Sequence, residues 1–218
     1  MAHSPRHPNT IQIASAPKPR WKQLSHRRLQ TWPSDLTKDT LLAFPLPKWL
    51  AEPIIPRLHS LPVITQTQDH IFTDSPHQAP NHVLINEYLS GQGIMAHKDG
   101  SAYHPVVCTV SLGGSLCLDI YGTKEDGTIE SVPRWKILQE PRSLLITTAD
   151  LYTEYLHGIA DVTQEINLNS ESIANWEFLR STESIKEGTV TRNTRTSLTF
   201  RDVIKVSSLG KFGMLGKR

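Results

Sequence analysis

From residue 83 to residue 159 the chain is a succession of short apolar runs, and this pattern constrains the fold more than any other feature. Each run is rich in β-branched or aromatic residues and ends near Gly, Pro, Asp or Ser, which is typical of β-strands. The runs are VLINEYL (83–89), VVCTVSLGG (106–114), SLCLDIYG (115–122), RSLLITT (142–148) and YTEYLHGI (152–159). Because 15 prolines and 12 glycines also interrupt helices, the sequence predicts a β-rich sandwich or barrel and no helical bundle.

A last strand is predicted at residues 194–203, TRTSLTFRDV. One face carries Arg195, Ser197, Thr199 and Arg201, and the other carries Thr196, Leu198, Phe200 and Asp202. An ordinary half-buried strand keeps its arginines in water. In a small barrel, however, one face of each strand lines the interior, so the polar face is also a candidate wall of a pocket.

The length of 218 residues fits one domain with its own core, which we place at residues 21–218. Residues 1–20 are basic, proline-rich and unpatterned, and we expect a flexible arm there. Residues 21–61 contain WKQLSHRRLQTW and PKWLAEPIIPRLHSL, which predict short helices packed on one side of a sheet. Residues 161–193 are polar without sustained periodicity, so we expect a long insertion that is either functional or disordered.

The formal net charge is only +2, but basic residues gather at both ends of the chain. Six Lys or Arg residues precede the first acidic residue, Asp35. The C-terminal stretch adds Lys205, Lys211, Lys217 and Arg218. Such ends either attract a polyanion such as nucleic acid or are solvated tails.

Cys108 and Cys117 each lie inside an apolar run, which predicts buried thiols in a reducing compartment. No apolar stretch approaches the ~20 residues that span a bilayer, and the first thirty residues lack the hydrophobic segment of a secretory signal. We therefore expect a soluble intracellular monomer, in the cytoplasm, the nucleus or both, without a membrane partner.

His97 and Asp99 stand two residues apart on an expected extended segment between Gly93 and Gly100. At this spacing both side chains project to one side and can offer two ligands to one ion. The pair is weak evidence alone, because roughly half of chains with this His and Asp content contain it by chance. His157, at the end of an apolar run, is the best candidate for a third ligand, although a lone His there is more often a core residue. Two imidazoles and one carboxylate leave open positions on iron(II) for a co-substrate and oxygen.

Arg195 is a candidate partner for such a co-substrate. An iron site that uses 2-oxoglutarate must hold the distal carboxylate in a dry pocket, and a planar guanidinium can do so with two parallel hydrogen bonds. This requirement favours the pocket-wall interpretation of strand 194–203.

Four motifs then follow in the order N-x-Y, H-x-D, LHGI and R-x-S-x-T-x-R. They consist of Asn86 and Tyr88, His97 and Asp99, His157, and Arg195, Ser197, Thr199 and Arg201. In this order they resemble the motifs of the AlkB-like Fe(II)/2-oxoglutarate dioxygenases. The stretches APKPRWKQLSHRRLQTW, NHVLINEYLSGQGIMAHKDG, EPRSLL and YLHGIA are most similar to the branch called AlkB homologue six, and the similarity runs from about residue 16 to the end.

The resemblance implies one dioxygenase domain that is mainly β with flanking helices: a double-stranded β-helix, or jelly roll, with the metal between its two sheets. It implies Fe(II) bound by His97, Asp99 and His157, and 2-oxoglutarate bound by Arg195, Asn86, Tyr88, Ser197, Thr199 and Arg201. With O2 as co-substrate, the implied reaction hydroxylates an N-methyl group, and the product then releases formaldehyde.

Two features depart from the family pattern. Family members carry a strand and helices before the APKP segment, whereas Met1–Ser15 is short and unpatterned, which fits a truncated or differently spliced start. The insertion at residues 161–193 also makes the spacing from His157 to Arg195 longer than in bacterial members.

The substrate is not fixed by the resemblance. Ser101, Tyr103 and His104 lie just past the H-x-D pair and are candidates for a lip around a flipped base, or for structural residues. We expect oxidative N-demethylation of alkylated DNA or RNA. The alternatives are a protein hydroxylase or demethylase on the same scaffold, and a catalytically weak module that binds nucleic acid or protein.

Overall fold

Strands dominate the computed structural model, which describes residues 20–61, 69–180, 182–185 and 187–208. The larger sheet is antiparallel and has the order β1-β2-β4-β13-β6-β9. Its strands are β1 (Lys22–Leu24), β2 (Arg27–Trp32), β4 (His82–Tyr88), β13 (Arg195–Val203), β6 (Tyr103–Gly113) and β9 (Leu144–Thr148). The smaller sheet, also antiparallel, contains in order β5 (Ile94–His97), β10 (Leu156–Ile159), β7 (Leu116–Tyr121) and β8 (Trp135–Gln139).

The two sheets face each other across a cavity that both of them line. Strands β4, β13, β6 and β9 form one layer of four, and β5, β10, β7 and β8 form the other. The chain passes repeatedly between the layers, as from β4 to β5 to β6 to β7. Two four-stranded antiparallel layers connected in this way form a jelly roll, so the predicted fold class is confirmed.

Strand β13 is buried on both faces along its whole length. Its polar face, from Arg195 to Arg201, lines the cavity between the sheets. Its other face places Leu198 and Phe200 in the main hydrophobic core. The arginines of this strand are therefore not in water, and the pocket-wall interpretation is confirmed.

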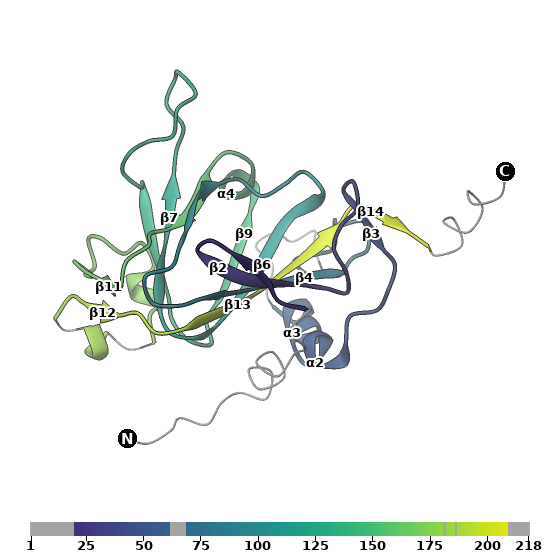
Figure 1. The fold of residues 1–218 in the computed structure, drawn as a ribbon, viewed down its shortest axis with the longest axis horizontal. Coiled ribbons are helices and arrows are strands. Elements are labelled where there is room, and N and C mark those ends of the chain that lie inside the picture. The colour runs from purple at the N-terminus through teal and green to yellow at the C-terminus, as the bar shows by residue number, and fades with distance from the viewer. Residues whose placement is uncertain (1–19, 62–68, 181, 186, 209–218) are drawn as a thin grey trace.

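Two short helices, α2 (Lys48–Ala51) and α3 (Ile54–His59), cover the outer face of the larger sheet (Figure 1). Leu50 and Leu58 anchor them in the core that contains Phe200. The prediction of helices for the second segment of residues 21–61 is thus confirmed. The prediction for the first segment is wrong, because residues 22–32 form the β1–β2 hairpin, and β2 pairs with β4. Pairing to an existing sheet edge outweighs the weak local helix preference.

Two further differences concern the smaller sheet. The run at residues 152–159 is a strand only over β10, because its first residues belong to the helical turn α4 (Ala149–Thr153). Strands β5 and β8 were not among the predicted strands, and each is only four or five residues long. A pattern of period two is hard to detect in so few residues.

The segment 161–193 packs on the outer face of the smaller sheet. It contains the two-stranded ladder β11 (Gln164–Glu165) and β12 (Val190–Thr191) and the 3-10 turns η2 (Trp176–Phe178) and η3 (Glu183–Ile185). Leu168, Ile173 and Ile185 are buried against Cys117 and Leu138 of the sheet. The described part of this segment is therefore attached to the jelly roll by its own apolar residues.

The remaining ladder joins β3 (Thr40–Leu42) and β14 (Lys205–Ser207) in parallel. Within the described ranges, no helix is long and apolar enough to cross a membrane. The flexible arm predicted at residues 1–20 lies outside the described residues except for Arg20, which is exposed.

Candidate metal centre

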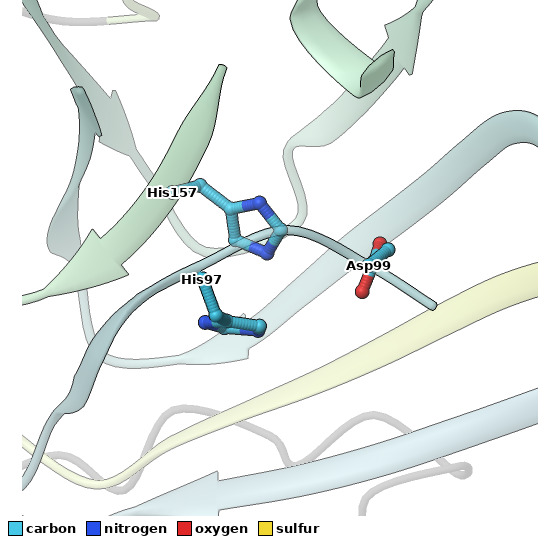
Figure 2. Close-up of side chains that lie close together, drawn as sticks. All are labelled: His97, Asp99 and His157. Carbon is cyan, nitrogen blue, oxygen red and sulfur yellow. The ribbon is translucent and has the colours of Figure 1, made fainter. Parts of the chain in front are cut away.

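His97, Asp99 and His157 lie close together, as Figure 2 shows, and all three line the cavity. His97 ends β5, Asp99 lies in the loop that follows, and His157 comes from the neighbouring strand β10. Strand pairing places His157 opposite His97. One ligand atom from each of the three residues lies within 4.8 Å of the others, so the structure brings together all three residues that the sequence predicted as ligands.

The imidazole of His97 is oriented by its own strand. Its Nδ1 lies 2.8 Å from the carbonyl oxygen of Met95. Because a carbonyl can only accept, the neutral tautomer that fits this contact has its proton on Nδ1 and its lone pair on Nε2. A metal-binding histidine commonly has this second hydrogen bond, which fixes both tautomer and ring orientation.

The imidazole of His157 is held neutral by its surroundings. Burial lowers its pKa to about 4, and the nearby charge of Asp99 only partly opposes the shift. Its ring centroid lies 4.4 Å from that of His97. Neutral imidazole is the form that binds a metal, so the site favours the ligand state of His157 at neutral pH.

Arg201 holds the carboxylate of Asp99. The Nη2 atom of Arg201 donates to Asp99 Oδ1 at 2.6 Å, and both side chains are almost fully buried. The guanidinium lies 4.8 Å from the ring centroid of Tyr103. Across the same loop, the Tyr152 hydroxyl donates to the carbonyl oxygen of Gly100 at 3.1 Å. These contacts restrict the loop that carries the carboxylate ligand.

Arg195 also lines the cavity, is buried, and has spare hydrogen-bonding capacity. Its Nη2 donates to Ser111 Oγ at 2.9 Å and also to Gln139 Oε1. Burial lowers the pKa of Arg195 to about 10, so the guanidinium stays charged at neutral pH. Its Nε is buried without a hydrogen-bond partner among the described residues. A buried cation with an unused donor is suited to bind a carboxylate.

The other predicted co-substrate residues lie on the two central strands of the larger sheet. Cross-strand pairing places Tyr88 opposite Arg195 and Asn86 opposite Ser197. The cavity has a volume of about 130 Å³. Its lining includes every predicted metal and co-substrate residue, namely Asn86, Tyr88, His97, Asp99, His157, Arg195, Ser197, Thr199 and Arg201.

Some lining residues were missed from the sequence. Gln139 from β8 and Leu151 and Tyr152 from α4 line the cavity together with Arg27 from β2. Gln139 is buried although polar, but a single glutamine at the end of a short strand does not stand out in a sequence. Arg27 donates from Nε to Asn86 Oδ1 at 3.1 Å, a contact that depends on the hairpin that the sequence did not predict.

The predicted substrate lip differs from the observed lining. Ser101, Tyr103 and His104 do not line the cavity, and the Tyr103 ring packs on Arg201. A contact between these three residues and a substrate stays a prediction. A larger, open groove of about 860 Å³ lies beside the cavity, and Arg27 and His97 line both spaces.

The family model of the 2OG-Fe(II) oxygenase superfamily matches residues 7–201. The chain belongs to this superfamily. A protein of Danio rerio named "Probable RNA/DNA demethylase ALKBH6" is 38% identical over 213 residues, which cover 95% of this chain and 83% of that protein. A Macaca fascicularis protein named "tRNA (carboxymethyluridine(34)-5-O)-methyltransferase ALKBH8" is 31% identical over 57% of this chain and 18% of its own length. The solved structure "The structure of OsALKBH1" covers 56% of this chain and 48% of its own at 24% identity, with a TM-score of 0.34.

The family match and the Danio rerio relative confirm the AlkB-like resemblance, and the enzyme is an Fe(II)/2-oxoglutarate-dependent dioxygenase. The residues that line the cavity fit both Fe(II) and 2-oxoglutarate. His97, Asp99 and His157 would supply the nitrogen and oxygen ligands that iron(II) accepts on one face. Arg195, with its unpartnered Nε, would supply the cation for the distal carboxylate of 2-oxoglutarate.

Proposed function

We propose that the enzyme removes methyl groups from nitrogen atoms of alkylated nucleic acid. The observation that carries this proposal is the groove beside the metal centre. Leu24, Ser25, His26 and Arg27 of the β1–β2 hairpin line one part of it, and His97 lines another. Arg27 is the cationic residue of the hairpin that lines the groove, and it also lines the cavity of the metal centre. A guanidinium next to the reactive position suits a phosphate of a nucleic-acid backbone whose base enters the cavity.

The closely similar Danio rerio protein supports this assignment, since it is named as a probable RNA/DNA demethylase. When bound, Fe(II) and 2-oxoglutarate supply the oxidation of a methyl group by O2. The residues of the chain hold and orient these groups, and the apolar side chains of Leu118, Ile120 and Leu145 exclude water from the cavity. The hydroxylated methyl group then leaves nitrogen as formaldehyde.

The test is a succinate-formation assay with Fe(II), 2-oxoglutarate and a panel of methylated DNA, RNA and peptides. We expect methylated DNA or RNA to stimulate succinate release and to yield formaldehyde, and we expect His157→Ala to abolish both. Binding of the nucleic acid should weaken steeply with salt. Stimulation by peptides alone would favour a protein hydroxylase or demethylase. Succinate release no faster than in a metal-free control would indicate a catalytically weak binding module.

We also propose that the enzyme works inside the cell as a monomer, in the nucleus, the cytoplasm or both. Both cysteines are free and buried, and burial raises the pKa of the Cys108 thiol to about 12. Such thiols suit a reducing compartment. Light scattering on the purified chain and imaging of a tagged chain in cells would test the two statements.

A further inference from the structure

Arg192 and Glu165 form a buried ion pair at the base of the segment 161–193. Their side chains are only 3% and 5% exposed. Arg192 Nε donates to Glu165 Oε1 at 2.6 Å, and the same oxygen accepts from the backbone N–H of Cys117 at 2.8 Å. Glu165 lies on β11, Arg192 directly follows β12, and Cys117 lies on β7. The pair therefore connects the segment to the smaller sheet.

The guanidinium of Arg192 also bonds the backbone next to both strands that carry the candidate histidine ligands. Its Nη1 donates to the carbonyl oxygen of Ala160 at 2.6 Å and to that of Gln92 at 3.3 Å. Ala160 directly follows β10, the strand of His157, and Gln92 lies two residues before β5, the strand of His97. One side chain thus joins the end of one ligand strand to the start of the other.

The pairing between these two strands is irregular. His157 pairs with His97 and Ile159 pairs with Ile94, so β5 covers three residue steps where β10 covers two. A bulge of this kind disrupts the regular ladder locally and leaves its extra residue unpaired, so contacts outside the ladder can contribute to the register. The strands nevertheless approach closely at Gly93, where a Cβ atom would lie 2.2 Å from the Ile159 carbonyl oxygen.

We propose that Arg192, with Glu165 as its counter-ion, is a positioning pair that sets the register of β5 against β10. It thereby sets the separation of His97 and His157. The ladder of β11 and β12 lies on the same side of the molecule as β7 (Figure 1). Through the Arg192–Glu165 pair, the segment 161–193 acquires a function at the metal centre. The role rests on the metal centre of the proposed function and is independent of its substrate.

Arginine is required because three separated acceptors must be reached at once. Its planar guanidinium presents five N–H groups in a fixed fork, whereas the ammonium of lysine is a single point of attachment. Glu165 is required because an isolated buried cation is strongly disfavoured. Arg192→Lys therefore keeps the charge but loses contacts to the strands, and Glu165→Gln keeps an acceptor for Cys117 but loses the charge.

The test measures binding of Co(II), a stand-in for Fe(II) with visible absorption bands that report on its ligands. We expect Arg192→Lys and Glu165→Gln to weaken Co(II) binding by about tenfold or more, the range typical of residues that orient metal ligands, and to change the absorption bands. Hydrogen exchange should become faster at the amides of residues 94–97 and 156–159.

The matched control is Ile173→Ala, which removes a buried side chain of the same segment without touching the pair. It should lower the unfolding midpoint and leave Co(II) affinity within about twofold.

Co(II) affinity within about twofold of the parent in both variants would overturn the proposal. An equal loss of affinity in Ile173→Ala, at a matched unfolding midpoint, would overturn it as well. If Arg192→Lys does not fold, Glu165→Gln decides by the same criteria. Failure of the demethylase assignment would leave Co(II) binding intact in the parent, so the two failures are distinguishable.

Discussion

Arg201 and Asp99 form a nearly fully buried ion pair, with Nη2 and Oδ1 2.6 Å apart. Asp99 lies in a loop, while Arg201 lies on the central strand β13. The strand therefore fixes the direction of a carboxylate that the loop alone would leave free to rotate. Arg201, which the sequence placed in the co-substrate pocket, is in direct contact with a candidate metal ligand.

Replacing Arg201 with Gln should weaken metal binding. The variant keeps a hydrogen-bond donor but removes the charged contact that orients Asp99, and we expect about a tenfold rise in the dissociation constant for Co(II). Equilibrium titration measures this value. Arg28→Gln is the control, because Arg28 pairs with Glu87 and neither residue lines the cavity. Unchanged Co(II) affinity in Arg201→Gln would contradict the orienting role.

Arg195→Lys should raise the KM for 2-oxoglutarate by roughly 30-fold or more. Lysine retains the charge but not the paired donors, and charge-assisted hydrogen bonds contribute about 1.5–3 kcal/mol each. Gln139→Leu should raise the same KM by a smaller factor, because it removes the acceptor that orients Arg195. Steady-state kinetics with varied 2-oxoglutarate provide the measurement.

The matched control for Gln139 is Gln30→Leu. Gln30 is a fully buried glutamine whose Oε1 accepts a hydrogen bond from Trp32 Nε1, and it does not line the cavity. A KM for 2-oxoglutarate that rises as much in Gln30→Leu as in Gln139→Leu would show that the effect is a general loss of packing.

The convergence of the candidate metal ligands and Arg195 on one cavity could be predicted from the sequence because strands place residues two apart on one face, and because the motifs follow one another in a known order. Gln139 and Tyr152 could not, since a short strand and a single helical turn bring them to the cavity. The β1–β2 hairpin was missed for a related reason. Its local sequence allows a helix, and only the pairing of β2 with β4 selects the strand. The contact between Glu165 and Arg192 joins residues 27 apart, which no local pattern specifies.

Metal binding should stabilise the fold, and His157 should be necessary for this effect. At a free metal concentration of 100 times the dissociation constant, linkage contributes about 2.7 kcal/mol. For a chain of this size, that free energy corresponds to an increase in Tm of about 5–10 °C. Thermal unfolding with Co(II) and then with excess chelator measures the shift. His157→Ala should show none, whereas His104→Ala, outside the cavity lining, should keep it.

Folding stability should fall between pH 6.5 and pH 4 partly because of His82. The pKa of this residue is lowered from 6.5 to about 4, mainly by burial and also by the charge of Arg201, while the Ser34 carbonyl and Asp35 oppose the shift. Tyr103 packs beside the ring. Nε2 donates to Ser34 at 3.1 Å, but Nδ1 is buried without a partner among the described residues. A second proton would therefore add a donor with no acceptor.

The lowered pKa of His82 makes the folded chain less stable as the pH falls. Below pH 6.5 the unfolded chain takes up a proton at His82, whereas the folded chain does so only near pH 4, so acidification favours unfolding across this window. Between pH 6.5 and pH 4, the protonation of His82 lowers the free energy of unfolding by about 3 kcal/mol at most. Urea unfolding at pH 7.5 and pH 5 should show a smaller pH-dependent loss in His82→Gln than in the parent. His26→Gln, at an exposed position, should behave as the parent does. An identical loss in His82→Gln and the parent would show that His82 is not the group that titrates.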